Sequence, residues 1–107
     1  MQGVRDPTFQ RLDMGSAEAN EVRYGTSTPP PYDMSKIAVP TAVFWGKHDW
    51  LADPDDVQKI LDTVPAEMLV FVKEQTSFAH LDYTWAPAAR TEVYDDVVKL
   101  LDLYVPQ

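Results

Sequence analysis

The chain has 107 residues, and its 17 acidic against 9 basic side chains give a formal net charge of −8. A surface of this sign repels the phosphates of nucleic acids and anionic lipids, so we expect no nucleic-acid partner. The absence of cysteine excludes disulfides, thiolate metal sites and cysteine nucleophiles within these residues.

Residues 1–36 are weakly patterned and predict an irregular segment rather than a domain of their own. Within them, Pro-rich residues 26–32 have the composition of an extended connector that leads into the rest of the chain. A ligand for an SH3 or WW domain is the alternative. The first residues lack the apolar core of a signal peptide, and no apolar run approaches the ~20 residues that span a bilayer. If the chain is complete, we expect it to be soluble and cytosolic.

The middle of the chain predicts a strand followed by a helix. The apolar run at residues 41–45 is typical of a buried strand, and Gly46 ends it. Residues 54–64 predict an amphipathic helix, with Asp53 as the N-cap and Pro54 at the first helical position. The apolar residues of this helix recur at helical spacing: Val57, Ile60, Leu61 and Val64.

The last third of the chain predicts a second strand and a second helix. Residues 68–72 form another apolar run, residues 73–83 read as a loop that contains His80, and residues 87–104 predict the final helix. A strand, a helix and a strand in this order form a right-handed unit, so the two strands should be parallel. The β-α-β-α order predicts an incomplete parallel sheet of an α/β fold over residues 37–107.

The residues that follow the two strands carry the candidate chemistry. Asp49 follows the first strand and His80 follows the second, and the carboxyl ends of neighbouring parallel strands lie at the same sheet edge. A carboxylate that holds one imidazole nitrogen leaves the other nitrogen free to act as a base, as in serine hydrolases. An exposed loop histidine and a helix-capping aspartate are the plainer explanations, and spacing alone does not decide between them.

Other polar residues near these positions have simpler interpretations. His48 is a rival partner, but its place beside Asp49 on a tight loop predicts that it points elsewhere. Asp53 is better explained as the helix cap, and Asp82 as a supporting or surface carboxylate. A metal site built from the histidines and these aspartates lacks any standard ligand spacing, so we expect no metal and no other cofactor.

Four stretches resemble one known family. They are Pro30-Pro-Tyr-Asp33, Val39-Pro-Thr-Ala-Val43, Gly46-Lys-His-Asp-Trp-Leu-Ala-Asp-Pro54 and His80-Leu-Asp-Tyr-Thr-Trp85. Together they resemble the C-terminal part of the acid lipases, which are the gastric and lysosomal lipases of the α/β-hydrolase superfamily. The resemblance extends from about Leu12 to Tyr104.

The resemblance carries several implications. It implies that residues 37–107 are the C-terminal portion of an α/β-hydrolase fold and that residues 1–36 are the end of the lipase cap region together with the Pro-rich connector. It also implies hydrolysis of carboxylic esters of lipids, acylglycerols or steryl esters, with Asp49 as the catalytic acid and His80 as the catalytic histidine. A secreted or lysosomal location is a further implication.

The sequence departs from the family in one respect. The nucleophile of the family lies in a Gly-x-Ser-x-Gly turn, and none of the serines at positions 16, 27, 35 and 77 has this surrounding. We therefore expect a lipase fragment that lacks the nucleophile and acts on lipid esters only when an upstream half supplies it. Two alternatives remain: an inactive lipase-like remnant that binds another chain through an exposed sheet edge, and an unrelated α/β binding domain.

Overall fold

The computed structural model describes residue 2 and residues 8–105. The chain forms two compact units, Met1–Met34 and Ser35–Gln107. Within the described residues, no helix has both the length and the apolar composition needed to cross a bilayer.

Among its described residues, the first unit contains a helix that the prediction of an irregular segment did not include. Helix α2 (Ala17–Tyr24) begins after Ser16, whose hydroxyl accepts a hydrogen bond from the Ala19 N–H at 3.1 Å. It ends at Gly25, which has the left-handed φ of 73° that favours glycine. These are ordinary N-cap and C-cap signals, but the helix itself has little apolar periodicity, and this lack hid it in the sequence.

The Pro-rich connector in this unit is anchored to the chain that precedes α2. Gln10 and Pro31 form an isolated antiparallel bridge, and the Tyr32 N–H donates to the Phe9 carbonyl at 3.0 Å. The rings of Phe9 and Tyr32 also pack, with their centroids 5.0 Å apart. The connector is therefore held by hydrogen bonds and ring packing within the first unit.

The second unit has the predicted parallel sheet. After the short turn η1 (Met34–Lys36), strand β1 (Thr41–Gly46) pairs in parallel with β2 (Leu69–Gln75), and helix α3 (Pro54–Thr63) connects them. The strand-helix-strand prediction is thus confirmed. Strand β2 is longer than expected at its carboxyl end, because residues 73–75 continue the strand instead of opening a loop.

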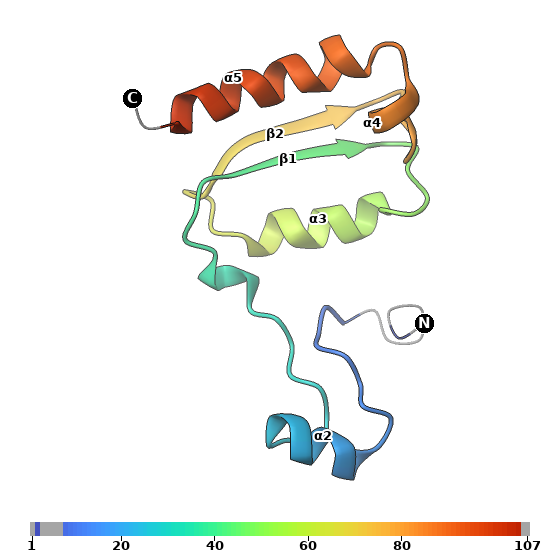
Figure 1. The fold of residues 1–107 in the computed structure, drawn as a ribbon, viewed down its shortest axis with the longest axis vertical. Coiled ribbons are helices and arrows are strands. Elements are labelled where there is room, and N and C mark those ends of the chain that lie inside the picture. Colours follow the sequence, from blue (N-terminus) through green and yellow to red (C-terminus); the bar gives the residue numbers. More distant parts are fainter. Residues whose placement is uncertain (1, 3–7, 106–107) are drawn as a thin grey trace. The chain divides into compact units, whose positions relative to one another are not determined.

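The remaining helices differ from the prediction in two places. Helix α4 (Asp82–Trp85) forms a single turn that begins at the end of the expected loop, residues 73–83, and continues past it. The last helix then begins with a π-helical turn, η2 (Arg90–Tyr94), and continues as α5 (Asp95–Tyr104). Helix α5 lies on one side of the sheet and α3 lies on the other (Figure 1).

The core of this unit is small and lies near the carboxyl ends of the strands. Phe78, Ala89 and Val93 form a buried cluster, and Phe44 and Tyr83 pack against it. The Phe78 and Tyr83 rings meet edge to face at 5.4 Å. The core therefore joins the loop after β2 to the start of the last helix.

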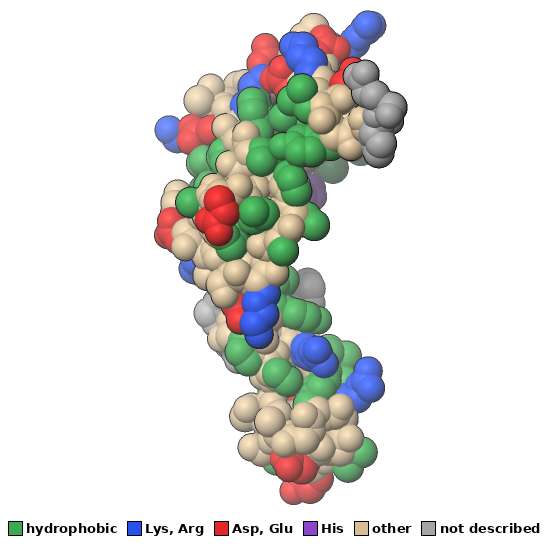
Figure 2. Space-filling view, turned by 90° about the vertical axis from the view of Figure 1, so that its left-hand side faces the viewer, with side chains coloured by type: hydrophobic (Ala, Val, Ile, Leu, Met, Phe, Trp, Pro, Cys, Tyr) green, Lys and Arg blue, Asp and Glu red, His purple; other side chains and the backbone are tan. Residues whose placement is uncertain are grey.

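Much apolar surface of the second unit stays exposed. On β2, Val70 and Val72 are 39% and 44% exposed. A groove of about 330 Å³ runs between the start of the sheet and α5, and its walls include Pro40, Val97 and Leu101. Figure 2 shows apolar side chains grouped on this part of the surface, with charged side chains around them. Parallel sheets are normally covered on both faces, whereas these apolar side chains stay exposed.

Candidate active site

The turn after β1 buries the carboxylate of Asp49. The Asp49 N–H donates to the Gly46 carbonyl at 3.1 Å, which closes the turn. Oδ1 of Asp49 then accepts hydrogen bonds from the N–H groups of Leu51 and Ala52, both at 2.8 Å. The residue is only 4% exposed, so its carboxylate is held by the backbone of its own loop.

His80 lies on the loop after β2, two residues before the start of α4. The carboxylate of Asp82 accepts a hydrogen bond from the Ala79 N–H at 2.7 Å, and the Asp82 N–H donates to the Ala79 carbonyl at 3.1 Å. This reciprocal pair fixes the backbone on both sides of His80. The His80 side chain is half-exposed, so one edge of its ring faces away from the protein.

The two loops bring Asp49 and His80 together. Nδ1 of His80 lies 2.9 Å from Oδ2 of Asp49, although 31 positions separate the residues in the sequence. An ionised carboxylate can only accept hydrogen bonds, so Nδ1 must carry a proton, and in the neutral imidazole Nε2 then presents a lone pair. The contact therefore fixes the orientation of the ring, with Nε2 directed away from Asp49.

The surroundings of Asp49 favour its ionised form. Burial by itself raises the pKa of the Asp49 carboxyl, but the hydrogen bonds from Ala52, His80 and Leu51 together hold this pKa below its ordinary value of 3.8. Asp49 is therefore a carboxylate at neutral pH, and its negative charge lies against the imidazole of His80.

The structure gives the other candidate residues the simpler roles. Asp53 caps α3, since its side chain accepts a hydrogen bond from the Asp55 N–H at 2.8 Å. His48 is exposed, and no hydrogen bond among the described residues joins its ring to Asp49. No three carboxylate, imidazole or thiolate side chains come together in residues 8–105 in a way that could hold a metal ion.

Tyr83 is a site residue that the sequence reasoning missed. It lines a hollow of about 300 Å³ beside β1 and α3, together with Asp49 and His80. Its hydroxyl is buried and has no hydrogen-bond partner among the described residues. Burial, and then the negative charge of Asp49, raise the pKa of Tyr83 to about 12. The available signal was the aromatic position of the His80-to-Trp85 motif, which lies three residues after His80.

An apolar groove lies on the exposed side of His80. It has a volume of about 480 Å³, and the side chains of Trp50, Leu51 and Leu81 form its apolar walls. Trp50 is 90% exposed and Leu51 is 79% exposed, which is unusual for side chains of this size. A molecule that approached His80 from this side would meet an apolar surface.

Comparison with known proteins relates the chain to lipases. It is 41% identical over 100 residues to gastric triacylglycerol lipase of Rattus norvegicus, which covers 94% of this chain and 25% of that protein. It is 38% identical over 103 residues to lysosomal acid lipase/cholesteryl ester hydrolase of Homo sapiens, covering 96% of this chain and 25% of the relative. Lipase 3 of Drosophila melanogaster is 34% identical over 96 residues, covering 90% and 24% respectively.

The matches cover a much larger share of this chain than of its relatives. The chain spans about a quarter of the length of the curated relatives it matches, whereas the matches cover nearly all of the chain. No family model matches it. The similarity therefore extends along the chain but concerns only a segment of each relative.

Proposed function

We propose that this chain, which is homologous to a segment of the acid lipases, supplies the acid and the base of a serine-hydrolase triad that cleaves lipid esters. The observation that carries the proposal is the 2.9 Å contact between Asp49 and His80, formed by the loops after two parallel strands. The proposal includes the wider fold: the two strands would be the C-terminal strands of an α/β-hydrolase sheet, and residues 1–36 the end of its cap region.

His80 would act through Nε2. This nitrogen would take the proton of a serine hydroxyl as the serine oxygen attacks the ester carbonyl, and it would return the proton to the leaving alcohol. The resulting imidazolium would lie against the Asp49 carboxylate, which keeps the ring orientation and compensates the charge. Water would release the acid in a second step by the same proton transfers.

The surface around His80 supports an apolar substrate. Trp50, Leu51 and Leu81 form an apolar groove beside the imidazole, and such a groove favours the hydrocarbon part of an ester over a charged group. Two relatives are named for triacylglycerol and for cholesteryl esters. We infer that the substrate is an ester of this class.

The nucleophile and the oxyanion donors would come from outside these residues. None of the serines at positions 16, 27, 35 and 77 has glycines two residues before and two residues after it, as the nucleophile turn requires. The chain by itself should therefore not hydrolyse esters faster than free imidazole does. The nucleophile and the oxyanion donors, which usually contribute most to the rate, would not be present.

The exposed apolar surface of β2 supports a second candidate. An inactive remnant could use the free edge of the sheet and the exposed Val70 and Val72 to bind another chain. The same surface fits completion by the rest of a lipase, so it does not separate the two candidates. Catalysis by a completed protein separates them.

The test is a chimaera in which this chain replaces the homologous quarter of rat gastric triacylglycerol lipase. We expect hydrolysis of a short-chain p-nitrophenyl ester by the chimaera, loss of nearly all of it on His80→Ala, and none by the chain alone. A folded chimaera that is inactive, or one that His80→Ala leaves active, would refute the proposal. Turnover by the chain alone that a serine-directed phosphonate abolishes would show that the nucleophile lies within it.

A further inference from the structure

The end of β2 is joined to both loops of the candidate site. Gln75 is the last residue of this strand, and it is only 6% exposed. Its carbonyl accepts hydrogen bonds from the Lys47 N–H at 3.0 Å and from the Phe78 N–H at 3.4 Å. Lys47 and Phe78 each lie two residues before a member of the Asp49–His80 pair. A single carbonyl therefore helps to set the spacing between the two loops.

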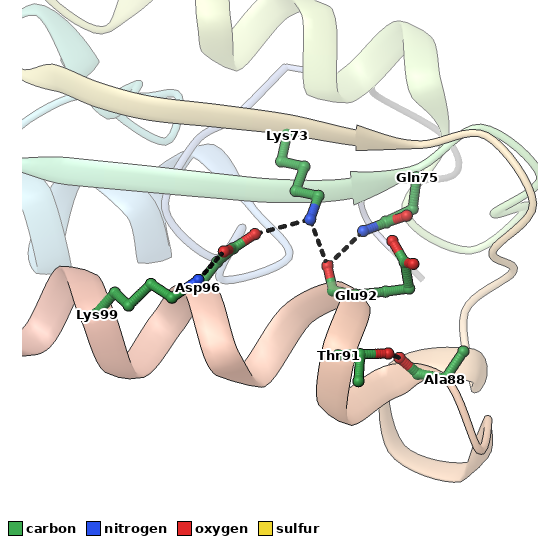
Figure 3. A network of polar contacts seen from close by, with 7 residues as sticks. All are labelled: Lys73, Gln75, Ala88, Thr91, Glu92, Asp96 and Lys99. Atoms are coloured by element: carbon green, nitrogen blue, oxygen red, sulfur yellow. Dashed lines mark hydrogen bonds and ion pairs between the residues drawn. The ribbon is translucent and has the colours of Figure 1, made fainter.

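The side chain of Gln75 fixes this strand end to the last helix. Nε2 of Gln75 donates to the carbonyl of Glu92 at 2.6 Å, and Nζ of Lys73 donates to the same oxygen at 2.8 Å (Figure 3). Lys73 also forms an ion pair with Asp96 at 2.7 Å. A carbonyl oxygen has two lone pairs, so the two side chains match its hydrogen-bonding capacity.

The acceptor of these bonds belongs to an irregular turn. Glu92 lies within η2, where the helix takes the wide π-helical form. Such turns are rare and occur frequently at functional sites. Here two side chains of β2 bind a carbonyl of the turn, which gives a physical reason for the helix to widen at this point.

We propose that Gln75 is a positioning residue for the Asp49–His80 pair. Its amide anchors the end of β2 to Glu92, and its carbonyl then holds the backbone two residues before each member of the pair. Because a hydrogen bond weakens steeply once the donor and acceptor move beyond ordinary distances, a loop displacement of about 1 Å is enough to break the contact of His80 with Asp49. The predicted effect on kcat rests on the function proposed above, whereas the predicted effect on the His80 ring does not.

The test uses the whole 107-residue chain and reads the ring of His80 directly. Long-range ¹⁵N–¹H correlation spectra report which ring nitrogen carries the proton. The unaltered chain should show the Nδ1–H form as the major one. Gln75→Asn keeps an amide but is one methylene too short to reach Glu92, and it should make the Nε2–H form the major one. Gln75→Met, which lacks the donor altogether, should show the same change.

The control shortens an amide side chain whose hydrogen bond does not involve the Asp49–His80 loops. Gln58 lies on the surface of α3 and donates to Asp62 at 2.8 Å, so Gln58→Asn should leave the His80 tautomer unchanged. In the chimaera, Gln75→Asn should lower kcat by about 10²-fold with KM unchanged, as a misplacement of about 1 Å can do. The milder Gln75→Asn serves as the decisive variant if Gln75→Met does not fold.

The outcomes separate this proposal from the proposed function. If Gln75→Asn lowers the unfolding temperature but leaves the tautomer of His80 as it is, Gln75 merely stabilises the fold and the proposal is wrong. If Gln75→Asn changes the tautomer of His80 while the chimaera with an unaltered Gln75 is inactive, the positioning role of Gln75 is supported and the catalytic role of the pair is refuted. The tautomer is read without turnover, so neither result depends on the other.

Discussion

Gly46 and the carbonyl of Phe78 lie so close together that a side chain at position 46 has no room. A Cβ built on Gly46 would lie 2.5 Å from the Phe78 oxygen and 3.2 Å from its carbonyl carbon. The same oxygen accepts a hydrogen bond from the His48 N–H at 3.2 Å. Glycine is therefore required by the close approach of the two loops, and this approach brings Asp49 and His80 within reach of each other.

Gly46→Ala should destabilise the second unit. The obstructing atoms belong to the backbone and cannot rotate away, so the two loops must separate, at a cost of about 1–3 kcal/mol for overpacking. Chemical denaturation measures this cost, and the His80 ring should lose its Nδ1–H preference in the same variant. Gly25→Ala is the control, because the strain of its left-handed φ of 73° belongs to the other unit and should leave His80 unaffected. An unchanged denaturation midpoint for Gly46→Ala would contradict the close approach.

Asp49→Asn should abolish most of the turnover of the chimaera. An amide can present its N–H₂ group to Nδ1 and then stabilises the wrong tautomer of His80, a change that costs about 10⁴-fold in the well-studied serine-protease triad. Steady-state kinetics with a p-nitrophenyl ester measures the loss. The matched control is Asp53→Asn, which keeps a capping oxygen and should change turnover by a few-fold at most. Equal losses in the two variants would mean that the catalytic acid is misassigned.

Acid should destabilise the chain partly through Asp49. Burial raises the pKa of this carboxyl, but the hydrogen bonds to it hold the pKa below the ordinary 3.8 in the folded chain. The folded state then binds fewer protons than the unfolded state in this range. The stabilisation is present above pH 3.8 and is lost as the pH falls through the folded pKa. Asp49→Asn should flatten this part of the stability curve measured by urea unfolding.

Two other carboxyls also have lowered pKa values, so they contribute to the acid sensitivity of the unaltered chain. The hydrogen bond from the Gly15 N–H lowers the pKa of Asp13, and the hydrogen bond from Lys73 lowers that of Asp96. Asp49→Asn should therefore remove part of the acid sensitivity and leave the rest. A variant whose acid sensitivity matches that of the unaltered chain would contradict the favourable surroundings of Asp49.

Tyr83 should make the chain less stable in alkali. Burial of its hydroxyl, and then the charge of Asp49, raise its pKa from 10.0 to about 12. Between these values the unfolded chain releases the phenolic proton and the folded chain keeps it, so stability falls as the pH rises. Tyr83→Phe should remove this fall, and spectrophotometric titration should lose one late-titrating tyrosine.

At neutral pH the same substitution should cost little. The Tyr83 hydroxyl finds no hydrogen-bond partner among the described residues, so its removal sacrifices no bond that the structure contains. The phenylalanine ring keeps the edge-to-face contact with Phe78. Tyr83→Phe should leave the urea midpoint unchanged or slightly raised, and a large loss of stability would show that the hydroxyl is bonded in solution.

Local sequence signals located the central elements of the second unit. The apolar runs and the Asp53-Pro54 start gave β1, α3 and β2, because the burial of apolar side chains and helix capping act over a few residues. Parallel pairing followed from the order of these elements, since a short helical crossover permits little else. The juxtaposition of Asp49 and His80 was predicted from this topology together with the motifs that contain them.

The tertiary structure decided what depends on distant partners. Residues 73–75 are polar and read as a loop, yet they extend β2 because they pair with residues 44–46 of β1. The side chains of Lys73 and Gln75 also bind Glu92 and Asp96, 17 to 23 positions away. The π-helical turn, whose Glu92 carbonyl accepts two of these bonds, was not predicted from the local sequence. The burial of the Tyr83 hydroxyl near Asp49 likewise arises only when the two loops meet. The sequence by itself determined which candidate residues follow the two strands, and long-range packing decided how closely they are held.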